Sequence, residues 1–190
     1  MSILDTLAVN FDLPILEWIA ANLRCGVLDF LMPLITVLGD GGIFWIACAV
    51  LMMILPKYRK TGFSMAIALI FGLIICNMTL KPLVQRIRPY DFQWEEFGKE
   101  IILLIEAQHD FSFPSGHTIA SFEAATAILL RNKKLGIPAM ILACLIAFSR
   151  MYLYVHYPTD VIASIILGVA FAFLATWIVN KLYARFQKAK

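Results

Sequence analysis

Charged residues are scarce in this sequence. Asp, Glu, Lys and Arg make up only 15% of the 190 residues, whereas 61% are hydrophobic. Proteins that fold in water carry about 25% charged residues, so the composition excludes an ordinary soluble domain. The mean hydropathy of +0.81 indicates instead a chain that folds within a lipid bilayer.

Cysteine spacing typical of a disulfide framework or a metal site is also missing. Cys25, Cys48, Cys76 and Cys144 lie far apart, and no C-x-x-C or Cys/His pattern joins them. Three of the four lie inside apolar runs, where free cysteine behaves as a small hydrophobic residue. The sequence has no acidic cluster suited to Mg²⁺ or another metal ion either. We therefore expect no disulfide, no metal site and no cofactor.

Signals that would divide or process the chain are absent as well. The N-terminus carries Asp5 and Asp12 instead of the basic residues of a signal peptide, so we expect the first segment to be retained. No internal repeat and no Ser- or Gly-rich linker interrupts the sequence. We expect helices within 1–38, a transmembrane domain over 39–182 and a basic tail over 183–190.

The hydrophobic residues are gathered in long runs, with short charged clusters between them. Runs of about 20 residues can cross about 30 Å of hydrocarbon as helices, so the pattern predicts an all-α protein, a polytopic transmembrane helical bundle of five to six spans. Five spans are predicted at 42–56, 62–83, 115–131, 136–155 and 159–180. The acids within 1–38 suit helices that lie in the membrane interface, and a sixth span near 24–38 stays open.

Basic residues are distributed unevenly among the loops. Segments 57–60 and 131–134 and the tail hold Lys and Arg without an acid, whereas residues 90–112 hold six acids and one lysine. Because loops rich in Lys and Arg stay cytoplasmic, the acidic loop is predicted to lie outside the cytoplasm. The same flanking positions explain the net charge of +3, so nucleic-acid binding is not expected.

Three polar clusters lie at the outer ends of predicted spans. They are Lys81 with Arg88 and Pro89; Pro114, Ser115, Gly116 and His117; and Ser149, Arg150, His156 and Asp160. Ionisable residues at membrane depth are costly and usually line a functional cavity. Lys81 and Arg88 are seven residues apart, so a continuous helix would present both to one anion. Arg86 is interpreted as an ordinary juxtamembrane charge.

The segment around Ser115 has the features of a helix start. Pro114 cannot continue a preceding helix, Ser115 is a favoured N-cap, and Gly116 permits close backbone approach. Free amide groups at a helix start bind phosphate oxygens. His117 would lie in the first turn, where it could protonate a leaving oxygen as general acid. The alternative is a capped helix with an interfacial histidine.

His156 and Asp160 are four residues apart across a second predicted helix start. If this turn is helical, the Asp160 carboxylate can accept a hydrogen bond from one ring nitrogen and leave the other free as a nucleophile. The alternative is a His-Asp pair that only stabilises the loop. Arg150 adds a bidentate phosphate ligand. Together the clusters supply the cations, histidines and acid that phosphoryl transfer without a metal requires.

The three clusters resemble the three motifs of the type 2 phosphatidic acid phosphatase superfamily, which also includes vanadium haloperoxidases and glucose-6-phosphatase. Order and spacing both match, over roughly residues 39–180, and the short chain resembles the small bacterial members. The resemblance implies that His156 forms a phosphohistidine, that Asp160 orients it, and that His117 protonates the leaving group and later activates water. It implies phosphate binding by Lys81, Arg88, Ser115, Gly116 and Arg150.

Glu123 lies outside these motifs, two turns into the helix that Ser115 is predicted to begin. An unpaired carboxylate is costly at that depth. We therefore expect Glu123 to be protonated or hydrogen-bonded between helices in a structural role, with an effect on substrate choice as the alternative.

The expected function is a metal-independent membrane phosphatase that acts on a lipid-linked phosphate at the outer face of the cell membrane. Undecaprenyl diphosphate is the preferred substrate; phosphatidylglycerophosphate, phosphatidic acid or lipid A phosphate is the alternative, because the motifs recognise phosphate and not its carrier. The spans argue against a haloperoxidase, which needs a soluble protein. A transporter or structural membrane protein with an inactive site is the hypothesis from a different class, and the intact histidines oppose it.

Membrane lipids are the expected surroundings of the chain, and its oligomeric state stays open. Small residues such as Gly72, Ala163 and Gly168 occur within the predicted spans. Such residues serve packing within one chain as readily as packing between chains.

Overall fold

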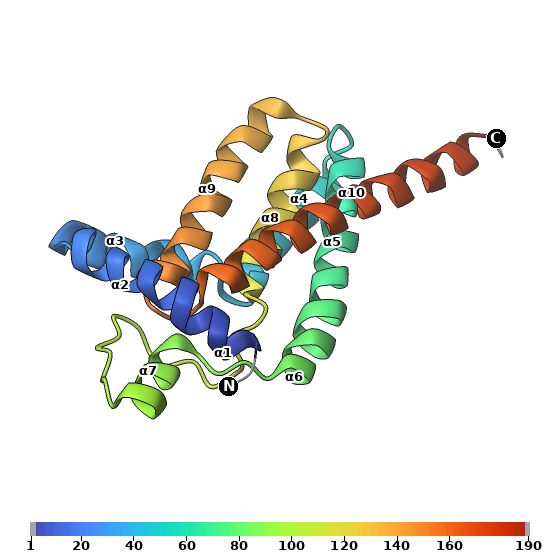
Figure 1. Ribbon diagram of the computed structural model, residues 1–190. Coiled ribbons are helices and arrows are strands. Elements are labelled where there is room, and N and C mark those ends of the chain that lie inside the picture. Colours follow the sequence, from blue (N-terminus) through green and yellow to red (C-terminus); the bar gives the residue numbers. More distant parts are fainter. Residues whose placement is uncertain (1–2, 189–190) are drawn as a thin grey trace.

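Most of the chain is helical, and no strand occurs among the residues that are described. The computed structural model describes residues 3–188 (Figure 1). In chain order the helices are α1 (Ile3–Leu7), η1 (Ala8–Asp12), α2 (Leu13–Asn22), α3 (Gly26–Val37), η2 (Asp40–Gly42), α4 (Ile43–Ile54), α5 (Arg59–Phe71), η3 (Gly72–Leu80), α6 (Lys81–Val84), α7 (Pro89–Phe97), α8 (Gly116–Leu129), α9 (Lys133–Tyr152) and α10 (Pro158–Lys188). Two of these, η1 and η3, are π-helical, and η2 is a 3-10 turn. The predicted all-α class is confirmed.

Helix α8 forms the centre of the bundle. It packs against α9, α10, α5 and α4, and ten of its fourteen residues are buried. Ala124, Ala125 and Ala127 are completely enclosed, and Gly168 of α10 lies close to the backbone of Ile119. Small residues at these places let helices approach closely, as is typical of bundles in membranes.

Fewer helices are long and apolar enough to span a membrane than the five to six that the sequence predicts. Among the described residues, three stretches qualify: Arg59–Phe97, Lys133–Tyr152 and Pro158–Gln187. A fourth arises if the pair Gly26–Val37 and Asp40–Ile54, bent by 41°, is counted as one span. The predicted segment 115–131 is helical, but a helix of 14 residues rises only about 21 Å. Other helices enclose α8, so it does not need the length that contact with lipid would require.

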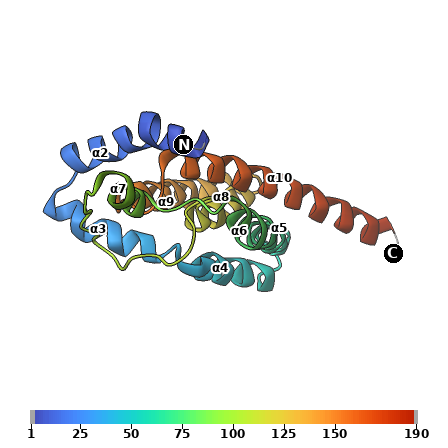
Figure 2. The same ribbon diagram turned by 60° about the horizontal axis from the view of Figure 1, so that its bottom comes forward.

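The N-terminal helices are part of the bundle near its α6–α7 end. With that end turned forward, α7 lies between α2 and α3 (Figure 2), and both α2 and α3 pack against α9. Leu16 of α2 and Phe92 of α7 belong to one buried apolar cluster. Ile19 of α2 and Leu153 belong to another. The segment 1–38 therefore packs directly on the part of the molecule that holds the polar motifs.

The basic turns lie together at the opposite end of the bundle. Residues 57–60 and 131–132 line one surface hollow with Tyr183, and Arg131 donates a hydrogen bond to Oδ1 of Asn180 at 2.9 Å. The turns α4–α5 and α8–α9 are at the top of Figure 1, whereas α6 and α7 are at its bottom. The basic and acidic connections of the chain are thus at opposite ends.

Candidate active site

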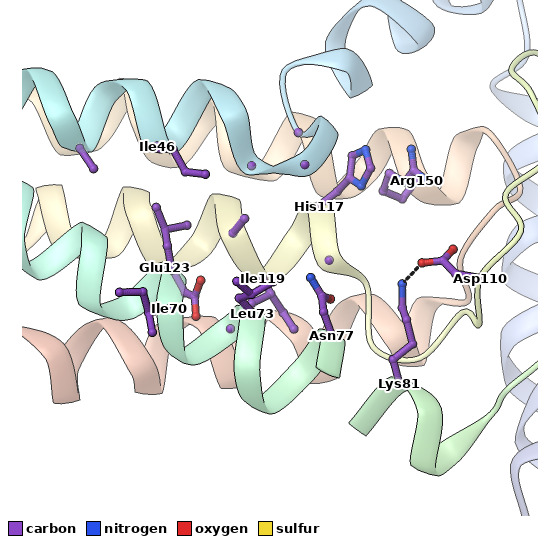
Figure 3. A pocket seen from close by; sticks show the side chains of 18 of the residues that line it. Ile46, Ile70, Leu73, Asn77, Lys81, Asp110, His117, Ile119, Glu123 and Arg150 are labelled. Atoms are coloured by element: carbon purple, nitrogen blue, oxygen red, sulfur yellow. Dashed lines mark hydrogen bonds and ion pairs between the residues drawn. The ribbon is translucent and has the colours of Figure 1, made fainter. Parts of the chain in front are cut away.

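Most of the predicted site residues line one cavity of about 730 Å³. Six of the eight line it, namely Lys81, Arg88, Gly116, His117, Arg150 and His156. Figure 3 labels three of these, Lys81, His117 and Arg150. Apolar residues of α4, α5 and α8 line much of the remaining wall. The other two predicted residues, Ser115 and Asp160, are fully buried next to Gly116 and His156. The cavity therefore joins a polar region to an apolar one.

Lys81 and Arg88 reach the cavity by a route that the sequence did not predict. Helix α6 ends at Val84, and Gln85 adopts a left-handed conformation with φ of 51°. Because a residue before proline is disfavoured in the helical region, Arg88 is extended and serves as the N-cap of α7. The prediction of one continuous helix through Lys81 and Arg88 is therefore wrong, although both side chains do converge.

Asp110 is the side chain on which Lys81 and Arg88 converge. Its carboxylate binds Nζ of Lys81, as Figure 3 shows, and Nη2 of Arg88. Burial alone would raise the pKa of Asp110, but the hydrogen bond from Lys81 and the two positive charges outweigh it and lower the pKa to about 2. A phosphate group bound by the same cations must share them with this carboxylate or displace it.

Arg88 is fixed beside the ring of His156. Its Nε donates to the carbonyl oxygen of Asp110 at 2.8 Å, and its Nη1 donates to the carbonyl oxygen of Val155 at 2.7 Å. The same Nη1 lies 3.3 Å from Nε2 of His156. A phosphate oxygen bound by this guanidinium group would therefore hold phosphorus close to Nε2.

His156 lies between α9 and α10 with its ring buried. Its Nδ1 is 3.5 Å from Oδ2 of Asp160, a distance longer than a normal hydrogen bond, and catalytic hydrogen bonds often shorten only when substrate is bound. Burial lowers the pKa of His156 well below its usual value, and the charges of Arg88 and Arg150 lower it further. The ring is therefore neutral at pH 7 and keeps a lone pair for attack.

Ser115 is the N-cap of α8, as predicted, but its side chain makes no capping hydrogen bond. Its Oγ accepts a hydrogen bond from Oγ1 of Thr118 at 3.0 Å, and its N–H donates to Oγ of Ser164 at 2.8 Å. The amide groups in the first turn of α8 are thus left without a side-chain cap, which is the arrangement that binds anions at helix starts. Gly116 lines the cavity here, and a Cβ atom at this position would lie 3.2 Å from Oδ1 of Asn77.

His117 is paired with Asp40, a residue that the sequence analysis did not single out. Nε2 of His117 lies 2.7 Å from Oδ1 of Asp40. Asp40 begins the turn η2, where Gly41 and Gly42 have φ values of 57° and 67° and let the chain reverse. A carboxylate on one ring nitrogen fixes the orientation of the other. The available signal was an acid flanked by glycines between two apolar runs.

Arg150 is almost completely buried near the end of α9. Its Nη1 donates to Oγ1 of Thr36 at 2.7 Å, whereas its Nε has no hydrogen-bond partner among the described residues. A buried donor without a partner is costly. Arg150 lines the cavity, so its guanidinium group is placed to bind a phosphate oxygen there.

Arg86 is buried, so its interpretation as an ordinary juxtamembrane charge is wrong. Its Nη1 donates to Oδ1 of Asp160 at 2.6 Å, and its Nη2 donates to Oδ2 of Asp12 at 2.7 Å. The interpretation assumed a helix that continues past Val84, whereas the turn at Gln85 directs the next residue into the bundle. The acid predicted to orient His156 is thus itself bound by an arginine.

Glu123 lines the cavity on the side away from Lys81 and Asp110 (Figure 3). It is buried, and neither carboxyl oxygen accepts a hydrogen bond from a side chain among residues 3–188; the carboxyl group lies against the backbone of Gly72 in η3 instead. A Cβ atom at Gly72 would lie 2.6 Å from both oxygens. The missing side chain of Gly72 therefore provides the space that the carboxyl group occupies.

The substitution Asp110→Asn is expected to strengthen inhibition by inorganic phosphate about tenfold, because Lys81 and Arg88 would no longer share an anionic partner. The competitive inhibition constant measures this effect. Glu106→Gln removes a charge at an exposed position of the same loop and is expected to leave the constant unchanged. Weaker inhibition in Asp110→Asn would mean instead that the carboxylate positions the two cations for phosphate.

The fold is that of a membrane-embedded helical protein, and its cations and histidines gather at one cavity. The chain matches the model of the PAP2 superfamily over residues 57–184. It belongs to this superfamily, which confirms the resemblance found in the sequence. Residues 81–160, with all three motifs, lie inside the matched range, whereas Asp12 and Asp40 lie before it.

Relatives include phosphatases that are named for lipid substrates. The chain is 30% identical over 171 residues to an undecaprenyl-diphosphatase of Sulfolobus acidocaldarius, and this alignment covers 90% of this chain and 79% of that protein. It is 32% identical over 161 residues to phosphatidylglycerophosphatase B of Bacillus subtilis, and this alignment covers 78% of this chain and 68% of that protein. A crystal structure of a transmembrane PAP2-type phosphatidylglycerolphosphate phosphatase from Bacillus subtilis matches with a TM-score of 0.70 and 25% identity, over 88% of this chain and 84% of that one.

Proposed function

We propose that the protein is a membrane phosphatase that removes phosphate from a lipid-linked substrate through a phosphohistidine at His156. The observation that supports this proposal is the cavity, which joins the cations around His156 to apolar side chains of α4, α5 and α8. A phosphate group and a hydrocarbon chain would each meet matching side chains there.

In the first step, Nε2 of His156 attacks phosphorus. The N–P bond forms while the bond from phosphorus to the leaving oxygen breaks, and the electron pair of the broken bond stays on that oxygen. His117 acts as general acid and gives the leaving oxygen its proton. Lys81, Arg88 and Arg150 stabilise the charge that develops on the other phosphate oxygens.

In the second step, water releases the phosphate group. His117 takes a proton from a water molecule, whose oxygen attacks phosphorus, and the electron pair of the N–P bond returns to Nε2 of His156. Inorganic phosphate leaves, and both histidines regain their starting states. Asp160 supports the positive charge that the His156 ring carries between the two steps, and Asp40 supports that of His117.

Metal independence is part of the proposal. In many phosphoryl-transfer enzymes Mg²⁺ neutralises the charge on the transferred group. Here Lys81, Arg88 and Arg150, together with the amide groups at the start of α8, supply positive charge at the same cavity.

Undecaprenyl diphosphate is the preferred substrate, and its hydrolysis would give undecaprenyl phosphate. Two observations support this preference: the name of the Sulfolobus acidocaldarius relative, and an apolar wall that includes Ile46, Val50 and Leu69 and suits a hydrocarbon chain. Phosphatidylglycerophosphate, phosphatidic acid and lipid A phosphate are the alternatives. The relative named phosphatidylglycerophosphatase B supports the first of these.

We also propose that the site lies at the outer face of the cell membrane. The basic turns at 57–60 and 131–132 share one end of the bundle, and Figure 1 shows them opposite α6 and α7. Because basic connections stay cytoplasmic, the part of the cavity that Asp110 lines would face outward. Such an orientation suits a carrier lipid that is recycled on the outer side.

Phosphate release in detergent, with and without EDTA, tests this proposal. The substrates are undecaprenyl diphosphate, phosphatidylglycerophosphate, phosphatidic acid and glucose 6-phosphate. We expect the lipids to be hydrolysed, undecaprenyl diphosphate fastest, at rates that EDTA does not change. A preference for glucose 6-phosphate would contradict the lipid assignment, and a loss in EDTA that Mg²⁺ restores would contradict metal independence. No release from any substrate would favour a non-enzymatic membrane protein.

A further inference from the structure

A buried arginine between two carboxylates connects the N-terminal segment to the site. Arg86 donates to Asp160 of α10 at 2.6 Å and to Asp12 of η1 at 2.7 Å. Both aspartates are completely buried, and Arg86 is 5% exposed. The face of the guanidinium group lies 3.7 Å from the ring centre of Tyr157. Protein groups therefore surround all three charges, with little access to water.

With both aspartates ionised, the cluster carries one more negative charge than positive charge. Asp12 and Asp160 together contribute two negative charges, and Arg86 contributes one positive charge. Buried excess charge is costly unless a partner offsets it. Two ionisable residues lie beside Asp160: Tyr157, whose N–H donates to Oδ2 at 3.0 Å, and His156, whose Nδ1 lies 3.5 Å from the same oxygen. A His156 ring that holds phosphate on Nε2 and a proton on Nδ1 is positively charged, and it would make the cluster neutral.

We infer that Asp12 is a positioning residue for the reaction and acts through Arg86 and Asp160. Asp12 offsets the charge of Arg86, so Asp160 keeps its own charge available to the His156 ring. Without Asp12, Arg86 and Asp160 would form a neutral pair, and the phosphorylated ring would lose part of its electrostatic support. This inference rests on the proposed function of His156.

Asp12 also fixes the backbone beside Asp160. Its Oδ1 accepts a hydrogen bond from the N–H of Thr159 at 2.9 Å, and its Oδ2 accepts one from Oγ1 of Thr159 at 2.8 Å. The N–H of Thr159 belongs to the first turn of α10, where amide groups have no partner within the helix. A residue before the matched family range of 57–184 would thus complete the site.

The substitution Asp12→Asn tests the role of the charge, because it keeps the size and polarity of the side chain. The rate of phosphoenzyme formation is measured by rapid quench. The substrate is undecaprenyl diphosphate that carries ³²P in its terminal phosphate. We expect formation to slow by about tenfold or more, as for other residues that orient a histidine, with KM unchanged. Asp12→Asn combined with Arg86→Gln restores the net charge of the cluster, and we expect it to recover part of the rate.

Asp29→Asn is the matched control for loss of N-terminal packing. Asp29 is an aspartate of α3 that accepts a hydrogen bond from the Tyr152 hydroxyl at 2.6 Å, and this contact is separate from the cluster. We expect Asp29→Asn to lower the midpoint of thermal unfolding without slowing phosphoenzyme formation. Equal slowing in Asp12→Asn and Asp29→Asn would overturn the inference, as would a double variant slower than Asp12→Asn.

Two further results distinguish a failure of this inference from a failure of the proposed mechanism of His156 or of the folding of the variant. If the wild-type protein hydrolyses lipid phosphate but forms no phosphoenzyme, the proposed mechanism of His156 is wrong, whatever Asp12 does. If Asp12→Asn does not fold, Asp12→Glu is measured instead, because it keeps the charge. Folded Asp12→Glu is expected to retain most of the rate of phosphoenzyme formation, and complete loss of that rate would contradict a role for the charge.

Discussion

Replacement of His156 by alanine is expected to abolish phosphate release. Nε2 of His156 lies 3.3 Å from Arg88 within the cavity, where it would attack phosphorus and form the covalent intermediate. Loss of a nucleophile removes this pathway, and in other enzymes with covalent intermediates such losses reach on the order of 10⁴-fold to 10⁶-fold. Phosphate release in detergent and the yield of alkali-stable phosphoenzyme together measure the effect.

Two variants show whether the loss is chemical. His156→Gln fills more of the buried space than alanine does, so it limits the cavity that truncation would leave, and we expect it to be as inactive as His156→Ala. His109 is exposed in the loop before α8, and we expect His109→Ala to retain full activity. Hydrolysis at the wild-type rate by either folded His156 variant would refute the proposed mechanism.

The helical class and the grouping of the motifs were predictable because they depend on local features. Long apolar runs predict helices in a bilayer, and charge in the connections predicts which ends share a side. His156 and Asp160 are close in sequence across the start of α10, so their approach to 3.5 Å needs only a helical turn. Ser115 was correctly predicted as an N-cap because the side chain and the preceding proline are typical of that position.

The length and environment of α8 could not be predicted from the apolar run alone. A run of apolar residues is compatible with a helix in lipid and with a helix buried in protein. Helix α8 is of the second kind, because other helices cover ten of its fourteen residues. The environment of Glu123 was hidden for the same reason, since its contact with Gly72 joins two helices far apart in sequence.

The supporting residues of the site were missed because tertiary structure brings them in. Asp40 contacts His117 and Asp12 contacts Arg86, but both aspartates are remote in sequence from the histidines, and neither has a motif of its own. Arg86 was misjudged because its direction depends on Gln85, whose left-handed conformation has no strong sequence signal. The motif residues thus indicate the reaction class, whereas two carboxylates near the site, Asp12 and Asp40, come from segments before the matched family range.

His117→Ala is expected to slow phosphate ester hydrolysis by a factor that depends on the leaving group. His117 lines the cavity beside Gly116 and is fixed by Asp40 at 2.7 Å, which suits a general acid for the leaving oxygen. A lipid alcohol leaves poorly without a proton, so we expect phosphatidic acid hydrolysis to fall by about 10²-fold to 10⁴-fold. Nitrophenolate leaves readily without protonation, so the first step on p-nitrophenyl phosphate should be much less affected.

The second step of the proposed reaction, attack of water on the phosphoenzyme, should also slow in His117→Ala. Because His117 would also activate water, His117→Ala should accumulate phosphoenzyme when the first step remains fast. With p-nitrophenyl phosphate we expect a burst of nitrophenolate equal to the amount of enzyme, followed by slow turnover, in a stopped-flow measurement. Asp40→Asn, which keeps the histidine, should show a weaker effect of about tenfold on both steps. Equal losses on both substrates with no burst would show that His117 only binds phosphate, and would leave the acid and base to be sought elsewhere in the cavity.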